Sequence, residues 1–168
     1  MAKEIIRRII ELAVQAQELA SSIGIENLLQ PGLVKEMIIA EVLGHQLISS
    51  KRHADACDPS DRSIHYEYLS CKEGGSGQFD RMFTQPPEKR AESLSRITRN
   101  RKLYLAIFYK SNQILLKAIY ELEPAVVLAE ANRQLDRSKN TISHVGLSIN
   151  WAVQNGKLAY EHKKGNSS

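Results

Sequence analysis

Apolar positions near the start of the chain follow the 3.6-residue period of an α-helix. Isoleucine, leucine and alanine recur every three or four residues, which predicts an amphipathic helix over residues 3–22 that ends before Gly24. After a Pro-Gly turn, the same period predicts a second helix over 33–44, ending at Gly44. The apolar stripe of the first helix is broad. It has two interpretations: packing in the core, or a surface that packs partly across a two-fold axis.

Further along, short apolar runs bounded by turn residues predict β-strands. These runs begin at Leu47 and then cover residues 64–71, 103–109, 114–122, 147–153 and 157–160. The run 103–109 is the most apolar and is expected at the centre of the sheet. The glycine-rich segment 73–77 predicts a flexible turn, and 80–101 is polar and basic with a short helical pattern after two prolines. A helix is expected over 124–136, and the tail from Lys163 is expected to fray.

Helices and strands in this order indicate an α+β fold, a mixed β-sheet flanked by helices. The 168 residues, 42% hydrophobic and 25% charged, suit one domain with its own core. No run approaches 18 apolar residues, so we expect no membrane association, and the first residues lack the pattern of a signal peptide. Two cysteines, Cys57 and Cys71, fit a reducing cytoplasm and could pair across a hairpin. The net charge of +4 suits a polyanionic partner, although many unrelated proteins are equally basic.

The strongest chemical signal is an acidic cluster before the strand 64–71. Asp55, Asp58 and Asp61 precede that strand, Glu67 lies in it, and Lys72 closes it. Two carboxylates brought together by a hairpin can hold Mg²⁺, and a nearby lysine can orient an attacking water. Asp58 precedes a proline and is expected to be a turn residue. Glu67 lies among apolar and aromatic residues, where an unpaired carboxylate is costly, and this favours a metal or a partner charge.

Several segments occur in an order that resembles the small homodimeric type II restriction endonucleases of the PD-(D/E)XK superfamily. They are Gly24–Asn27, the Asp-Ala-Cys-Asp run 55–58, Tyr66-Glu67 with Ser70, 106–109, 118–124 and 155–160. The resemblance implies a restriction-endonuclease-like core in one domain over 1–168, with a helical dimerisation region over 1–32 and a catalytic and DNA-binding core over 33–162. It also implies a cytoplasmic bacterial enzyme that grips double-stranded DNA as a homodimer. Such an enzyme cuts a short palindrome with Mg²⁺, for which Mn²⁺ substitutes.

On this resemblance, Asp55 and Glu67 ligate the metal and Lys72 positions the water. Glu41, on the second expected helix, is a further possible metal-shell residue, although a solvated helix face explains it as well. The chain departs from the family pattern two residues after Glu67, where the expected lysine is Leu69. Because strand side chains alternate between faces, Lys72 reaches the site only if the strand bulges or the glycine turn bends it back. An alternative frame places a serine at the acid position, with Lys72 still as the motif lysine.

Polar and basic residues outside the carboxylate cluster are expected to contact DNA. Arg96, Arg99 and Arg101 of the basic segment would neutralise phosphates. Gln78 and Arg81, in the loop after the strand 64–71, and Ser143 and His144, before the expected last strand, would read base edges. The expected contacts are Gln78, Arg81, Arg96, Arg99, Arg101, Ser143 and His144.

Two other functions fit the sequence less well. Leu69 motivates a catalytically inactive DNA-binding dimer on the same fold. A thiol enzyme that uses Cys57 or Cys71 with His65 is a third hypothesis, but the sequence around these cysteines matches no known nucleophile motif.

Overall fold

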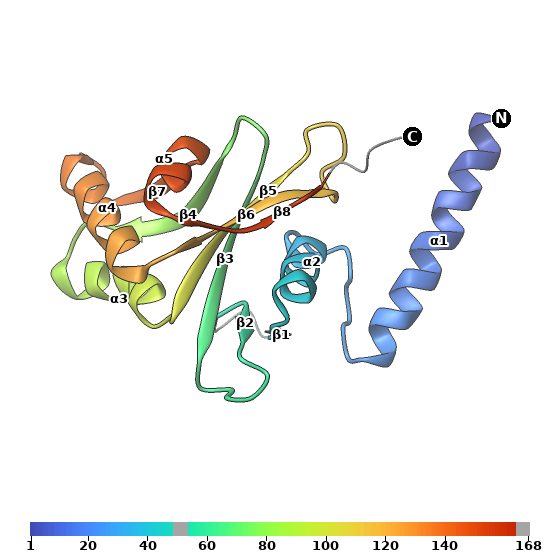
Figure 1. The fold of residues 1–168 in the computed structure, drawn as a ribbon, viewed down its shortest axis with the longest axis horizontal. Helices are drawn as coiled ribbons and strands as arrows, with labels where there is room; N and C mark the ends of the chain where they lie inside the picture. Colours follow the sequence, from blue (N-terminus) through green and yellow to red (C-terminus); the bar gives the residue numbers. More distant parts are fainter. Residues whose placement is uncertain (49–53, 164–168) are drawn as a thin grey trace.

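The computed structural model describes residues 1–48 and 54–163, and its main feature is a six-stranded sheet (Figure 1). Across this sheet the strands are β1 (Gln46–Leu47), β2 (Ala56–Cys57), β3 (His65–Lys72), β5 (Lys102–Phe108), β6 (Leu116–Leu122) and β8 (Lys157–Glu161). Strands β3 and β5 are parallel, whereas the other neighbouring pairs are antiparallel. The sheet is therefore mixed, as the sequence predicted.

Two layers cover this sheet. One core contains buried residues of a two-stranded sheet, β4 (Ser76–Phe83) with β7 (Ile142–Ser148), and of three helices: α3 (Pro87–Thr98), α4 (Pro124–Arg137) and α5 (Ile149–Asn155). A second core joins the opposite face of β3, β5 and β6 to α2 (Leu33–Leu43). The molecule has the predicted α+β class, with a mixed sheet flanked by helices.

The strand β5 is central because its side chains are buried on both faces. From Leu103 to Phe108 every residue is buried, as the continuous apolar run predicted. Its parallel partner β3 is reached by a crossover that contains β4 and α3. Proline begins both α3 and α4, where its missing N–H costs no intrahelical hydrogen bond.

Strand β4 was not predicted: the turn expected over 73–77 and the polar loop from residue 80 were wrong over 76–83. Its buried positions are few, Gly77, Phe79 and Met82, and a register shift against β7 interrupts their alternation. Gly77 is needed because a Cβ there would lie 2.8 Å from the Cβ of Leu69 on β3. The close packing of β4 against β3 therefore depends on Gly77, a residue type that in the sequence indicates a turn.

The strand predicted over 147–153 was also wrong, because the strand there ends at Ser148 and a helix follows. Ser148 caps α5: its hydroxyl oxygen accepts a hydrogen bond from the backbone N–H of Trp151 (3.1 Å). A short apolar run is compatible with a strand or a buried helix, and only the cap distinguishes them.

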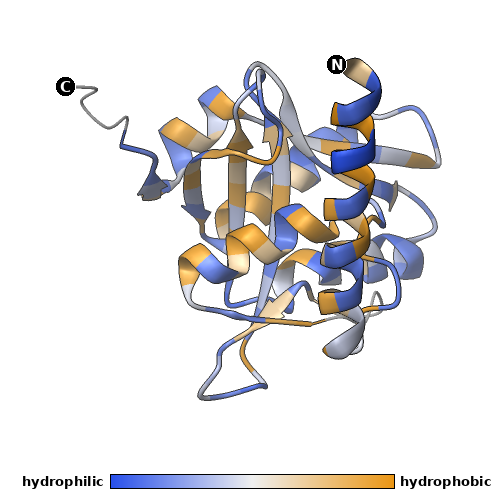
Figure 2. Ribbon diagram, turned by 90° about the vertical axis from the view of Figure 1, so that its right-hand side faces the viewer, coloured by the Kyte–Doolittle hydropathy of each residue, from blue (hydrophilic) through white to orange (hydrophobic). Residues whose placement is uncertain are grey.

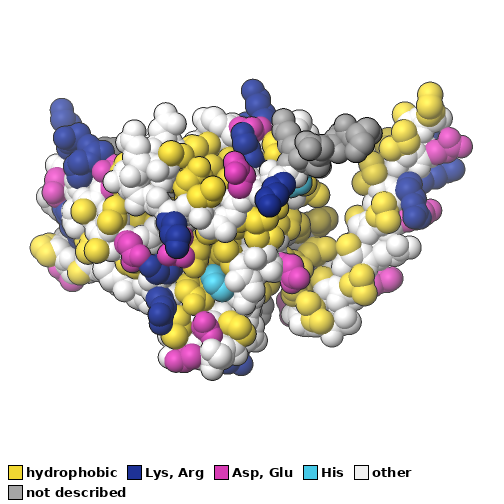
Figure 3. Space-filling model, viewed as in Figure 1, with side chains coloured by type: hydrophobic (Ala, Val, Ile, Leu, Met, Phe, Trp, Pro, Cys, Tyr) yellow, Lys and Arg dark blue, Asp and Glu magenta, His cyan; other side chains and the backbone are white. Residues whose placement is uncertain are grey.

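Helix α1 (Ala2–Ser22) matches its prediction, but most of its apolar stripe is not in the core. Ala20 is buried with Ile25 and Leu33, whereas Ile9 is 59% exposed and Leu19 is 72% exposed. Bands of hydrophobic residues run along α1 in Figure 2, and Figure 3 shows their side chains on the surface of the isolated chain. The interpretation of the whole stripe as core was wrong.

Cys57 and Cys71 are both free and buried. In the described part of the chain, no helix is long and apolar enough to cross a membrane. The tail that was expected to fray lies, beyond Lys163, outside the described residues.

Candidate functional site

The β2–β3 hairpin brings Asp55 and Glu67 together. Asp55 directly precedes β2, and its backbone N–H donates to the carbonyl of Tyr66 (3.1 Å). The backbone N–H of Tyr68 in turn donates to Asp55 Oδ2 at 2.6 Å. The Asp55 carboxylate is thus fixed against β3 beside Glu67, as the sequence predicted for the two carboxylates.

Both carboxylates lie in an environment that disfavours their charged forms. Burial raises the pKa of Asp55, against the effects of the Tyr68 hydrogen bond and of two arginines. Burial and then the nearby charge of Asp55 raise the pKa of Glu67 to about 8. Glu67 Oε2 is buried and has no hydrogen-bond partner among the described residues. The site therefore holds two crowded carboxyl groups with unused acceptor capacity, and a bound cation would favour their charged forms.

Two arginines at the C-terminal end of α3, Arg96 and the C-cap residue Arg99, favour the charged forms of these carboxyl groups. Arg99 Nη2 lies 3.9 Å from Glu67 Oε2, which makes an ion pair but is too long for a hydrogen bond. The charges of Arg99 and Arg96 lower the pKa of both Asp55 and Glu67. Arg96 is held by its own contacts: Nη1 donates to the carbonyl of Asp80 (2.7 Å), and the guanidinium lies over the ring of Phe79.

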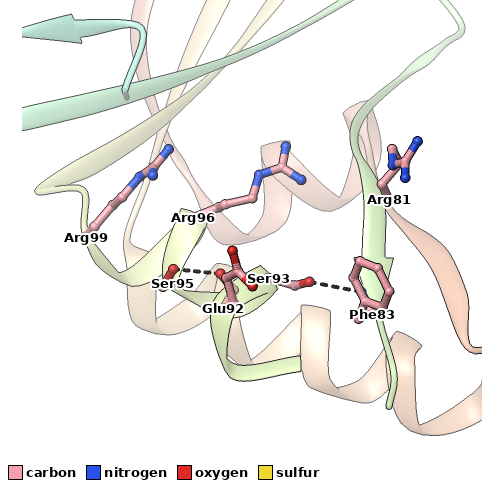
Figure 4. A pocket seen from close by; sticks show the side chains of 7 residues that line it. All are labelled: Arg81, Phe83, Glu92, Ser93, Ser95, Arg96 and Arg99. Carbon is pink, nitrogen blue, oxygen red and sulfur yellow. Dashed lines mark hydrogen bonds between the residues drawn. The ribbon is translucent and has the colours of Figure 1, made fainter. Parts of the chain in front are cut away.

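A cavity of about 400 Å³ lies beside these arginines (Figure 4). Its walls come from α3 and β4, and its lining residues are Arg81, Phe83, Glu92, Ser93, Ser95, Arg96 and Arg99. Arg81 lies at the register shift of β4 and has φ 54°, a left-handed conformation that is uncommon for residues other than glycine. Three guanidinium groups against one carboxylate make this cavity suited to an anion.

Lys72 is not brought to the carboxylates. Its strand pairs with β5 from Tyr66 to Lys72 without a register shift, so β3 has no bulge. Side chains alternate along such a strand, which places Lys72 on the face opposite to Glu67. Leu69 does share the face of Glu67, but it is 6% exposed and packs in the core. Lys72 therefore cannot supply a cation to the carboxylate pair, and Leu69, at the lysine position of the family pattern, carries no charge.

The helix α2 carries the predicted metal-shell residue Glu41 and a second glutamate, Glu36. Glu41 is exposed, whereas the charge of Glu36, half-buried and one turn earlier, acts on Glu67 and raises its pKa. The sequence offered two glutamates on this helix, and only the direction of the helix in space distinguishes them.

The other predicted DNA contacts fall into three groups. Gln78 and Arg81 lie on β4, and Ser143 and His144 lie on its partner β7, so all four belong to one two-stranded sheet. Arg96 and Arg99 line the cavity. Arg101 is exposed directly before β5 and lies outside the lining of the cavity.

No family model matches this chain, and no curated protein matches it significantly. Its chemistry therefore has to be inferred from the site itself. Among residues 1–48 and 54–163, no group of three or more His, Cys, Asp and Glu side chains forms a metal cage. A pair of carboxylates is nevertheless enough for Mg²⁺, which usually keeps several waters and binds one or two carboxylates. The buried Oε2 of Glu67, which accepts no hydrogen bond from the described residues, fits such an ion.

The cysteines do not support thiol chemistry. The β2–β3 register places Cys57 opposite His65, but the Cys57 side chain is 1% exposed and out of reach of a substrate. Burial raises the pKa of Cys71 to about 11, which keeps this thiol protonated and weakly nucleophilic.

Proposed function

We propose that this chain is a Mg²⁺-dependent endonuclease that hydrolyses phosphodiester bonds in double-stranded DNA, with the restriction-endonuclease-like core that the sequence resembles. One observation carries the proposal: the Asp55–Glu67 pair is buried next to an arginine-lined cavity. A hard cation suits the pair, and a phosphate suits the cavity. A metal-bound phosphodiester of DNA offers both groups at adjacent positions.

In this proposal the residues have separate roles. Asp55 and Glu67 would hold Mg²⁺, which when bound polarises the phosphate and activates a water for attack. The Tyr68 N–H keeps Asp55 oriented toward the ion. The arginines of the cavity bind the DNA backbone, and side chains of the β4–β7 sheet read base edges at a specific sequence.

We propose further that the active form is a homodimer, because the exposed stripe of α1 needs a partner and a two-fold dimer matches a palindromic site. Each protomer would then cut one strand of the duplex.

Digestion of long mixed-sequence DNA tests the proposal. With Mg²⁺ or Mn²⁺ we expect discrete fragments, with Ca²⁺ binding but little cutting, and with excess EDTA no cutting. Asp55→Asn and Glu67→Gln, which keep the side-chain shapes, should both lose cutting while their melting temperatures show a folded protein. Cutting in EDTA, or normal cutting by either variant, would contradict the metal site.

The second candidate is a DNA-binding dimer without catalysis, favoured by the burial of Leu69 where the family has its lysine. It predicts DNA that is shifted in a gel but stays intact with every divalent metal. Discrete fragments would exclude it.

A further inference from the structure

The carboxylate pair has cations beside it, but they come from α3 and not from β3. Arg99 is the C-cap residue of α3, and its guanidinium lies 3.9 Å from the carboxylate of Glu67 on β3. Arg96 lies one turn earlier on the same helix and acts on the same carboxylates. Positive charge is therefore present where the family resemblance expects a lysine, although the polypeptide supplies it from another element.

Of these two arginines, Arg99 is the one that lies next to the carboxylate pair without a hydrogen bond that fixes its guanidinium. Arg96 is anchored by the Asp80 carbonyl and stacks on Phe79. The side chain of Arg99 is 36% exposed, and 3.9 Å separates it from Glu67, so this contact fixes no hydrogen-bond geometry. A cation bound between the carboxylates would compete with this ion pair and leave the guanidinium available to a phosphate.

The cavity shows where that phosphate would lie. In Figure 4 the side chains of Arg81, Arg96 and Arg99 extend toward the same side, from β4 and α3. The left-handed backbone of Arg81 at the β4 bulge is a strained conformation, and such strain is concentrated at binding and catalytic sites. Arginine forks match the oxygens of a phosphate better than a lysine does.

We propose that Arg99 supplies the catalytic positive charge at this site, in place of the absent lysine, and that Arg81 and Arg96 hold the neighbouring phosphate oxygens. The inference rests on the proposed phosphodiester hydrolysis. In that step a water oxygen bonds to phosphorus while the bond from phosphorus to a sugar oxygen breaks. The water loses a proton to solvent, and the leaving oxygen gains one. Arg99 stabilises the extra negative charge on the phosphate oxygens during this exchange.

Four proteins test the role of Arg99: the parent, Arg99→Ala, Arg99→Lys and the control Arg137→Ala. Arg137 is an exposed arginine on α4 outside the cavity, so its removal changes the net charge equally. Two quantities are measured: the rate of cutting of mixed-sequence DNA with Mg²⁺, and the affinity for a short mixed-sequence duplex in EDTA, which needs neither metal nor turnover.

For Arg99→Ala we expect cutting to fall on the order of 100-fold, the usual loss of one transition-state donor. Its affinity in EDTA should fall by less than about tenfold, the size of a single phosphate contact. Arg99→Lys should recover part of the cutting because it keeps the charge without the fork, and the control should match the parent in both quantities. Arg99→Gln repeats the measurement if the alanine variant melts below the assay temperature.

The inference is overturned if Arg99→Ala cuts at the parental rate, or if its affinity falls as much as its cutting rate, which would make Arg99 a binding residue only. A parent that cuts no DNA overturns the proposed function itself. The two failures are distinguishable because only the second removes cutting from the parent and from the control.

Discussion

Glu67 shows how far single residues could be interpreted from the sequence. A carboxylate in an apolar strand, twelve residues after an aspartate in a matching motif, predicted a charged site, and the structure places Asp55 and Glu67 together. The compensating cation could not be predicted this way. Arg99 follows an entire helix, and only the packing of α3 against the sheet directs it toward Glu67.

The raised pKa of Glu67 gives a prediction about stability without metal. In the folded protein Glu67 keeps its proton up to about pH 8, whereas its ordinary pKa of 4.5 applies in the unfolded chain. Between these values the folded state binds the extra proton, so this group makes the free energy of unfolding fall as the pH rises. Glu67→Gln removes the titration. At pH 8 the variant should be more stable than the parent by roughly 1 kcal/mol or more.

Chemical denaturation in EDTA at pH 5 and at pH 8 measures this difference, which should nearly vanish at pH 5. Mg²⁺ should then stabilise the parent at pH 8, by about 1.4 kcal/mol at ten times its dissociation constant, and leave Glu67→Gln unchanged. Equal stabilities of parent and variant at both pH values would show that Glu67 is ionised and well compensated without metal.

The hydrophobic pattern predicted the long helices and strands, but it failed where a single residue determines whether a segment forms a strand, a turn or a helix. Helix α1 has a clear helical period and strand β5 is one continuous apolar run, and both were predicted. Strand β4 was missed because a bulge and Gly77 break its alternation, and α5 was taken for a strand because its start depends on the Ser148 cap. Arg81 lies at the same β4 bulge. The place where the strand pattern is interrupted is therefore also the proposed phosphate site.

The exposed stripe of α1 gives a prediction about assembly. Paired helices meet along a seam of apolar residues spaced alternately by four and three positions. On α1 the residues with this spacing are Ile5, Ile9, Leu12, Ala16 and Leu19. Charge also points to an antiparallel partner. In residues 1–10 three basic side chains exceed one acidic side chain, whereas residues 11–22 carry two acidic and no basic ones. A second copy running in the opposite direction pairs these halves, with Leu12 near the two-fold axis.

Leu12→Asp should therefore convert the proposed dimer into a monomer that keeps its fold, because a carboxylate at the axis would meet its own symmetry copy. Val14→Asp is the matched control: Val14 is 51% exposed and Leu12 48%, but Val14 lies on the opposite side of α1 from the seam. Sedimentation of the three proteins at micromolar concentration measures the result. A parent that sediments at 18.9 kDa, or an equal effect of both substitutions, would contradict this pairing.

For the whole molecule, the sequence correctly indicated the α+β class and the mixed sheet, because these follow from the order of long, regular segments. It could not indicate that the sheet has two very different faces. One face carries β4, β7 and three helices, whereas α2 packs on the other. The predicted DNA contacts on β4, β7 and α3 belong to the first layer, beside the face of β3 that carries Glu67. Their grouping follows from topology, which joins residues far apart in the chain.

The salt dependence of DNA binding connects this layer to the proposed dimer. Each phosphate contact contributes about 0.9 to the slope of log K against log salt concentration. Arg96 occurs twice in a dimer, so Arg96→Ala should lower the slope by about 1.8, but only by about 0.9 in the Leu12→Asp background.

His144→Ala, on the β7 side of the layer, should instead weaken the binding free energy by about 1–3 kcal/mol on a duplex that contains the cut site. It should leave binding to a scrambled duplex, and the salt slope, unchanged. Titrations of both duplexes at several salt concentrations measure these terms separately. An unchanged slope for Arg96→Ala would place the DNA backbone outside the arginine cavity, and with it the phosphate that Arg99 is proposed to stabilise.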